Sequence, residues 1–201
     1  MTHPSPPAPG GSQAPLDAVT GAFGYSGAAI ADRLQAAGRR VRTLTGHPDR
    51  APAGSTVEVR PLDFHDPAAL TDALRGTDTL YNTYWVRFGR GALDHRTATA
   101  RSRTLFRAAA DAGVRRVVHV SITHPAADSP YPYFREKART EQALADVGIP
   151  YSVLRPAILF GGRGAGRRRS DGLTGLMAIH VARLAAISVD RAGTEAGTAS
   201  G

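Results

Sequence analysis

The sequence predicts an α/β fold: a doubly wound parallel sheet of about six strands with helices on both faces. Two observations and one general rule of chain topology favour this fold. Short apolar runs that are typical of strands alternate with amphipathic helical segments from Leu16 to Phe160. Each helical segment ends at a glycine before the next strand begins. Crossovers between parallel strands are right-handed, which distributes the helices over both faces of one sheet.

The expected strands are short runs of alternating or continuously apolar residues. The first, "LDAVT", leads directly into a glycine-rich turn, and the fourth, "DTLYNTYW", leads into a loop. The fifth, "RRVVHVSI", is apolar enough to be a strand buried on both faces. We expect strands over residues 16–20, 41–45, 57–60, 78–85, 115–122 and 151–155.

The expected helices have ordinary start and stop signals. In the first, Ile30, Leu34 and Ala37 lie on one face at helical spacing. The second begins with Asp66 as its N-cap and Pro67 in its first turn. We expect helices over residues 25–38, 66–76, 94–112 and 133–148.

The two ends of the chain differ in composition from the predicted domain at residues 16–160. Residues 1–15 contain five prolines and no Lys, Arg, Asp or Glu, so we expect a disordered leader there. Residues 161–201 are rich in Gly, Arg and Ala, with one possible helix at 173–189. Its 17 residues are too few for an ordinary membrane-spanning helix.

The composition narrows the classes of function. The chain of 201 residues has no cysteine, which excludes disulfides and thiolate chemistry. Its formal charge of +8 would suit a protein that binds nucleic acid, but no nucleic-acid-binding motif is present. We therefore interpret the arginines as solvated. We see no secretory signal. We therefore expect a cytoplasmic protein with a small-molecule substrate of unknown identity and no nucleic-acid or membrane partner; the oligomeric state stays open.

The residue spacings that are typical of metal sites and of serine hydrolases are absent from the sequence. The seven histidines are scattered, and no pair of them has the spacing of metal ligands, so we expect no metal site. The G-x-S-x-G elbow of serine hydrolases is also absent. His119 lies in an apolar strand, and we interpret it as a core histidine with satisfied hydrogen bonds.

A glycine-rich turn, "VTGAFGYSG", joins the first strand to the first helix. Gly21 would allow the tight turn, Gly24 would let the backbone approach a pyrophosphate, and Gly27 would let the helix pack closely on the sheet. Phe23 and Tyr25 lie between these glycines and are expected to contact the same ligand. Glycines in a turn can be purely structural, but this position favours a dinucleotide on the helix N-terminus of a Rossmann-type domain.

The end of the second strand distinguishes NAD from NADP. An acidic residue there would bond the ribose 2′-hydroxyl, whereas an arginine would accommodate a 2′-phosphate. The segment "VRTLTGHPDR" contains Arg42 and Arg50 and no acid before Asp49, so we expect NADP, with NAD as the alternative. Both arginines can also be read as solvated. Asp63 follows the third strand and is either an adenine contact or a turn residue.

A tyrosine, a lysine and a serine complete the expected site. Tyr133 and Lys137, the only lysine in the chain, are four residues apart and face the same side of one helix. Ser121 ends the buried strand before them, at the edge where open α/β sheets bind ligands. A fixed ammonium nearby lowers the pKa of a tyrosine, which suits the phenol for acid–base chemistry near neutral pH.

The order of these motifs resembles that of short-chain dehydrogenases/reductases. "TGAFGYSG", "SI" at 121–122, "YFREK" and "LRPAILFGG" are similar to the extended or atypical branch, which includes NmrA-like and epimerase/dehydratase-like NAD(P)-binding proteins. The resemblance covers roughly residues 16–162. It implies that Tyr133 is the general acid/base, that Lys137 holds the nicotinamide ribose, and that Ser121 orients the substrate.

The same resemblance implies further contacts and two departures. Asn82 and Thr83 would lie in the loop beside the cofactor, and Pro156 would lie beside the nicotinamide. Arg101 stands near a position where related proteins often have asparagine. The residues after Gly161 do not resemble the substrate-binding lobe of extended members, and our hypothesis is a truncated or frame-shifted reading frame.

Two classes of function compete with an NAD(P)-dependent oxidoreductase or epimerase. One is a non-catalytic dinucleotide sensor of the NmrA-like kind. The intact serine, tyrosine and lysine set argues against it, and the missing substrate-binding lobe argues for it. The other is an inactive, truncated Rossmann fragment.

Overall fold

The computed structural model describes residues 13–86 and 94–156. Outside the described residues lie most of the expected leader, the tail at 161–201 and its possible helix at 173–189. The strands are β1 (Leu16–Thr20), β2 (Arg40–Thr45), β3 (Glu58–Pro61), β4 (Thr79–Asn82), β5 (Arg116–Val120) and β6 (Tyr151–Leu154). The helices are α1 (Tyr25–Ala36), a 3₁₀ turn η1 (Pro48–Arg50), α2 (Pro67–Leu74), α3 (His95–Asp111) and α4 (Pro132–Ala145).

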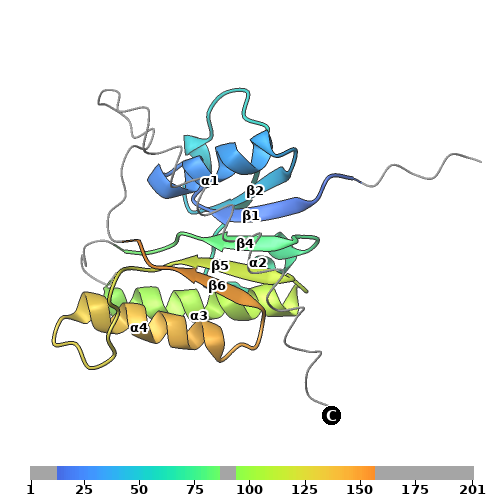
Figure 1. Cartoon of the computed structure of the whole chain (residues 1–201). Helices are drawn as coiled ribbons and strands as arrows, with labels where there is room; N and C mark the ends of the chain where they lie inside the picture. Colours follow the sequence, from blue (N-terminus) through green and yellow to red (C-terminus); the bar gives the residue numbers. More distant parts are fainter. Residues whose placement is uncertain (1–12, 87–93, 157–201) are drawn as a thin grey trace, which may run out of the picture.

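The six strands form one parallel sheet in the order β3-β2-β1-β4-β5-β6. Figure 1 shows β1 beside β4, where the chain reverses the direction in which it adds strands. This is the strand order of the dinucleotide-binding doubly wound fold, whose ligands bind outside the carboxyl ends of the strands at that reversal. The predicted fold class is confirmed. We call this side of the sheet the carboxyl edge and the opposite side the amino edge.

The described helices cover the two faces of the sheet unequally. On one face, Ile30 and Leu34 of α1 pack against Val19 and Val41. On the other face, α2, α3 and α4 share a larger core with the strands. Its largest fully buried side chains include Leu70, Leu80, Leu105, Phe106 and Leu144. Burial of each such side chain contributes about 1.5–3 kcal/mol, so this core is the main source of stability. The helices α3 and α4 lie side by side (Figure 1).

Local signals explain where the elements begin and end. The Asp66 carboxylate accepts a hydrogen bond from Ala69 N at 2.9 Å and caps α2, as predicted. The strand β4 ends at Asn82, earlier than the predicted residue 85, because the Asn82 side chain accepts a hydrogen bond from Tyr84 N at 3.0 Å and turns the chain. The turn η1 has no counterpart among the predicted elements.

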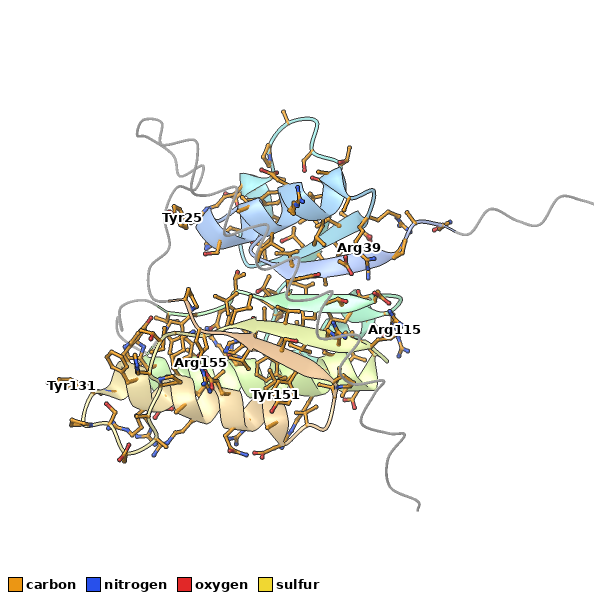
Figure 2. The ribbon with its side chains drawn as sticks, in the orientation of Figure 1. Tyr25, Arg39, Arg115, Tyr131, Tyr151 and Arg155 are labelled. Atoms are coloured by element: carbon orange, nitrogen blue, oxygen red, sulfur yellow. The ribbon has the colours of Figure 1, made fainter. Side chains whose placement is uncertain are left out.

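An ion-pair network lies at the amino edge. Asp17 on β1 is completely buried and accepts hydrogen bonds from the guanidinium of Arg39. Arg39 also pairs with Asp78 at 2.9 Å, and Asp78 pairs with Arg115 at 2.6 Å; Figure 2 labels both arginines. Burial raises the pKa of Asp17 despite its arginine partner, whereas the hydrogen bond from Arg115 lowers the pKa of Asp78. The network therefore satisfies every carboxylate that it contains.

Within the described ranges, no helix is long and apolar enough to span a membrane.

Candidate cofactor and catalytic site

The glycine turn leaves the N-terminus of α1 open. Gly21 has a φ of +66°, a conformation that side chains rarely adopt. A Cβ on Gly27 would lie 2.1 Å from the carbonyl oxygen of Gly21, so only glycine fits where α1 meets the turn. Gly24 is the N-cap and supplies no side-chain cap, and the first turn of α1 has no acidic residue. These features fit an anionic group on the exposed N–H groups of α1, as a dinucleotide pyrophosphate would require.

Two aromatic residues flank this turn. Phe23 is half-buried within it, and Tyr25 at the start of α1 is 40% exposed. Both therefore lie at the carboxyl edge, where the prediction places them, although no ligand contact tests that role.

Hydrogen bonds join the ends of β1 and β4 beside the turn. The backbone N–H of Thr83 donates to Thr20 Oγ1 at 2.7 Å, and Thr83 Oγ1 donates to the carbonyl of Thr20 at 2.6 Å. Thr20 Oγ1 in turn donates to Asn82 Oδ1 at 3.2 Å. The Asn82 amide lies 3.1 Å from His119 Nδ1 and is fully buried. Asn82 and Thr83 thus fix the start of the loop after β4, and their contact with a cofactor stays a prediction.

Lys137 is buried at the carboxyl end of β5. Its side chain is 2% exposed, and its Nζ donates to the carbonyl of Val120 at 3.3 Å. The same Nζ lies 4.1 Å from the centroid of the Trp85 ring, in cation–π geometry. Burial lowers the pKa of Lys137 to about 7, and the charge of Glu141 offsets this only in part. Such a depressed lysine pKa is common at functional sites.

Tyr133 stands on the same face of α4 as Lys137 and contacts the same tryptophan. The Tyr133 ring meets Trp85 edge-on, with centroids 6.1 Å apart, and meets His95 edge-on at 5.4 Å. Trp85 and His95 stack in parallel at 5.8 Å. The structure therefore brings the predicted tyrosine and lysine together around a tryptophan that comes from the loop after β4.

Ser121 follows β5 directly. Its backbone N–H donates to the carbonyl of Leu154 at 2.7 Å, and the residue is 4% exposed. Its hydroxyl has no hydrogen-bond partner among the residues that the structure describes. Native proteins rarely leave a buried hydroxyl unpaired, so this oxygen is available to a ligand. Pro156, two residues beyond Leu154, is half-buried at the same edge.

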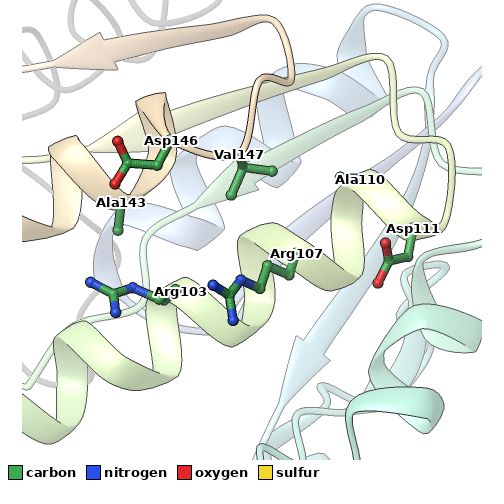
Figure 3. A pocket seen from close by; sticks show the side chains of 7 residues that line it. All are labelled: Arg103, Arg107, Ala110, Asp111, Ala143, Asp146 and Val147. Atoms are coloured by element: carbon green, nitrogen blue, oxygen red, sulfur yellow. The ribbon is translucent and has the colours of Figure 1, made fainter.

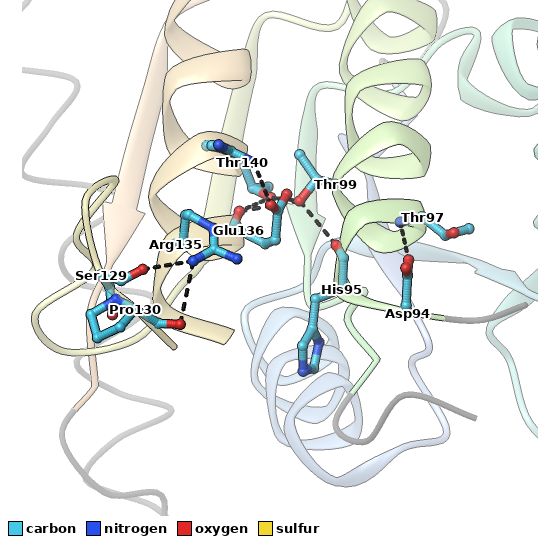
Figure 4. Close-up of polar contacts among 10 residues, drawn as sticks. Asp94, His95, Thr97, Thr99, Ser129, Pro130, Arg135, Glu136 and Thr140 are labelled. Carbon is cyan, nitrogen blue, oxygen red and sulfur yellow. Dashed lines mark hydrogen bonds and ion pairs between the residues drawn. The ribbon is translucent and has the colours of Figure 1, made fainter. Parts of the chain in front are cut away.

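Hydrogen bonds between α3 and α4 hold His95 near Tyr133. Thr99 Oγ1 bonds the carbonyls of both His95 and Glu136, at 3.1 and 3.2 Å. Thr140 Oγ1 donates to the Glu136 carbonyl at 2.8 Å and contacts Thr99 Oγ1. Figure 4 shows these contacts between the two helices, with His95 at the start of α3. The helices thus fix the relative positions of the two aromatic side chains.

The contacts of Arg42 argue against its interpretation as a 2′-phosphate ligand. Its guanidinium donates to the carbonyls of Ala73 and Arg75, at the end of α2, and pairs with Glu58. Helix ends that precede a strand lie at the amino edge, so this side chain points away from the cofactor edge. The reason is that Arg42 stands in mid-strand and is 9% exposed. Arg50, on η1 just beyond β2, remains exposed.

Asp63 follows β3 and is exposed. Its carboxylate accepts a hydrogen bond from His65 N at 2.9 Å, which is the contact of a turn residue. Of the two roles weighed for Asp63, the turn role is therefore seen, and a second contact with adenine is untested.

Two surface pockets that are lined by described residues lie away from the carboxyl edge. One of about 410 Å³ lies between the C-terminal halves of α3 and α4, as Figure 3 shows. Its lining residues are Arg103, Arg107, Ala110, Asp111, Ala143, Asp146 and Val147. A second, of about 370 Å³, includes Leu16, Gly38 and Arg39 at the amino edge. Neither contains a residue of the glycine turn or of the tyrosine and lysine pair.

A sequence model described as NAD(P)H-binding matches residues 21–192. The chain belongs to this NAD(P)H-binding family. The match starts at the first glycine of the turn and extends beyond residue 162, where the sequence resemblance is expected to end. Family membership confirms the predicted NAD(P) cofactor class and the resemblance to short-chain dehydrogenases/reductases.

Curated relatives of this NAD(P)H-binding chain include reductases. It is 33% identical to quinone oxidoreductase 2 of Escherichia coli over 142 residues, which cover 69% of this chain and 47% of that protein. It is 36% identical to (4-alkanoyl-5-oxo-2,5-dihydrofuran-3-yl)methyl phosphate reductase of Streptomyces griseus over 140 residues, covering 69% and 46%. An uncharacterized Mycobacterium tuberculosis protein is 32% identical over 72% of this chain and 15% of its own length. The chain thus spans half the length of these relatives or less.

Two of the solved structures that resemble this chain are complexes with NADP(H) or NADPH. The Citrobacter sp. triphenylmethane reductase complexed with NADP(H) has a TM-score of 0.59 and 28% identity, covering 72% of this chain and 50% of that one. The NADPH-dependent quinone oxidoreductase of Escherichia coli complexed with NADPH has a TM-score of 0.59 and 30% identity, covering 70% and 48%.

Sequence reasoning missed two aromatic members of the site and misread a third residue. Trp85 and His95 flank a loop, and neither has a motif that marks it; the one available signal is that Trp85 is the only tryptophan in the chain. His119 was expected to be satisfied, but its Nε2 is buried without a partner. Burial lowers the pKa of His119 to about 3, so it is neutral at ordinary pH.

Proposed function

We propose that this chain is the cofactor-binding part of an NADP(H)-dependent reductase in which Tyr133 is the general acid. One observation supports this most strongly. Tyr133 and Lys137 contact the same indole at the carboxyl edge, beside the unpaired buried hydroxyl of Ser121. A phenol, an ammonium and a free hydroxyl in one small region are the groups that carbonyl reduction needs.

The residues present would divide the chemistry as follows. When bound, the reduced nicotinamide would supply a hydride to the carbonyl carbon of the substrate. Tyr133 would donate its phenolic proton to the carbonyl oxygen as that oxygen gains the electron pair. Ser121 would hold the same oxygen by a hydrogen bond. The ammonium of Lys137 has three donors, of which Val120 takes one, and a ribose hydroxyl would take another.

The preference for NADP over NAD belongs to this proposal. Arg42 does not support it, because its guanidinium is engaged at the amino edge. Support comes from the exposed Arg50 beyond β2 and from the two related structures that contain NADP(H) or NADPH. The relatives that reduce quinones or other conjugated compounds favour a small conjugated carbonyl substrate. A cytoplasmic location is the setting that we propose for this cysteine-free chain.

Replacement of Tyr133 by phenylalanine tests the assigned role. We expect Tyr133→Phe to bind NADPH as the wild type does and to reduce 1,4-benzoquinone at least about 100-fold more slowly, because it has no proton to donate. The matched control is Tyr131→Phe, which changes an exposed tyrosine two residues away and should leave the rate unchanged. Full turnover by Tyr133→Phe would contradict the assignment. NADPH binding by the wild type with no turnover of any carbonyl would favour the non-catalytic sensor.

A further inference from the structure

Trp85 contacts both members of the tyrosine and lysine pair. Its ring face lies 4.1 Å from Lys137 Nζ, and the ring meets Tyr133 edge-on. We propose that Trp85 is the positioning residue of this site: its indole face holds the ammonium of Lys137 in the charged form, and its ring fixes Tyr133 beside it. The catalytic meaning of this inference rests on the proposed function, but the contact itself does not.

The buried ammonium has few other partners. Glu141, the acid that lies four residues further along α4, is bound by the guanidinium of Arg155 at 2.5 and 3.1 Å. His119, which faces Lys137 from β5, is neutral and fully buried. Within the described residues, Nζ donates one hydrogen bond, to the carbonyl of Val120, and it is long at 3.3 Å. The indole is therefore the closest compensation that the described residues offer for the cost of desolvating this charge.

The indole is well placed to do this because neighbouring contacts restrain it. The backbone N–H of the preceding residue, Tyr84, donates to the side chain of Asn82 at the end of β4. His95 stacks on the ring with an interplanar angle of 4°. Tyr133 contacts the ring from α4. A ring held in this way restricts the lysine that lies over it.

The choice of tryptophan follows from the electrostatics of the ring. The face of an aromatic ring is negative, tryptophan attracts a cation more strongly than tyrosine or phenylalanine does, and the attraction grows when water is excluded. Leucine would exclude water equally well but would offer no attraction to an ammonium. Phenylalanine would keep the attraction in weaker form. The three side chains therefore form a graded series for an experiment.

The composition of the chain makes the contact directly measurable. Lys137 is the only lysine and Trp85 the only tryptophan. Protein grown with labelled lysine gives one side-chain signal in an NMR spectrum, and its titration reports the pKa of Lys137. Protein grown with fluorinated tryptophans carries the change at position 85 alone, and each added fluorine withdraws electron density from the ring face while leaving its shape nearly unchanged.

We expect the pKa of Lys137 to fall stepwise with the number of ring fluorines, by roughly half a unit to one unit in total. Trp85→Phe should lower this pKa as well, and Trp85→Leu should also remove the ring-current shift of the lysine ε-protons. Phe64→Leu is the matched control, because Phe64 contacts Tyr84 and Arg101 but not Lys137. It should leave the lysine signal and its pKa unchanged.

An unchanged pKa across the fluorinated series would overturn the inference, and so would an unchanged ε-proton shift in folded Trp85→Leu. Both results are independent of turnover. If the lysine pKa falls as expected but wild-type protein reduces no carbonyl, the proposed reductase function fails and the Trp85 contact stands. If turnover is normal and the pKa of Lys137 does not respond to changes in the ring of Trp85, only the positioning role fails.

Discussion

The two edges of the sheet differ in how their buried charged groups are paired. At the amino edge, the carboxylates of Asp17 and Asp78 are both paired with arginines. At the carboxyl edge, the described residues offer no hydrogen-bond partner to the hydroxyl of Ser121 and no carboxylate to the ammonium of Lys137. Satisfied charges stabilise a fold, whereas unsatisfied ones lower its stability unless a ligand completes them. The difference favours the carboxyl edge as the functional one.

The largest effect should follow from breaking the amino-edge network. We expect Arg39→Met to lower the free energy of unfolding by about 3–5 kcal/mol at pH 7, because it leaves the fully buried Asp17 carboxylate unpaired. Urea unfolding measures this loss. The loss should shrink as the pH falls through the raised pKa of Asp17, since the protonated acid needs no partner. NADPH affinity should not change.

Arg75→Met is the control for that experiment. Arg75 pairs with Asp72 at 2.8 Å, but both side chains are about two-thirds exposed or more. Exposed pairs contribute little, so the change should stay within about 0.5 kcal/mol. A loss in Arg75→Met equal to that in Arg39→Met would contradict the view that burial makes the amino-edge network important.

A substitution of Lys137 at the carboxyl edge should change the stability by an intermediate amount and in the opposite direction. The pKa of Lys137 is lowered from 10.5 to about 7 in the folded state, so the unfolded state binds more protons between these values. The penalty for burying the ammonium is therefore fully present below about pH 7 and disappears as the pH rises towards 10.5. Lys137→Met should raise stability by on the order of 2 kcal/mol at pH 7, with the gain vanishing near pH 10.5. A pH-independent gain would exclude this cause.

The smallest changes in stability are expected for two variants that each remove one hydroxyl group. Ser121→Ala removes an unpaired buried hydroxyl and should raise the free energy of unfolding by about 1 kcal/mol while slowing turnover. Thr140→Val removes a hydroxyl that donates to Glu136 O at 2.8 Å, and it should lower stability by about 1 kcal/mol. Thermal unfolding of the two variants checks both signs. A loss of stability in Ser121→Ala would mean that this hydroxyl is satisfied in solution.

The sequence predicted those parts of the candidate site that depend only on residues close together in the chain. The turn at Gly21–Gly27 and the spacing of Tyr133 and Lys137 are set within a few residues, so the sequence alone indicated them. Trp85 was missed because its contact with Lys137 joins two residues that are distant in sequence. Arg42 was misread because its strand position was clear, but the direction of its long side chain depends on Ala73, Arg75 and Glu58, which are distant in sequence.

The central claim is that the carboxyl edge binds a dinucleotide and the amino edge does not. Thermal unfolding with NADPH or NADH tests it most directly, in the wild type and in one variant from each edge. At about 100 times the dissociation constant, NADPH should raise the midpoint by roughly 5–10 °C in the wild type and in Arg75→Met. Folded Gly27→Ala should show no such rise, because its Cβ displaces the turn. No rise in the wild type with either dinucleotide, or an equal rise in Gly27→Ala, would contradict the account.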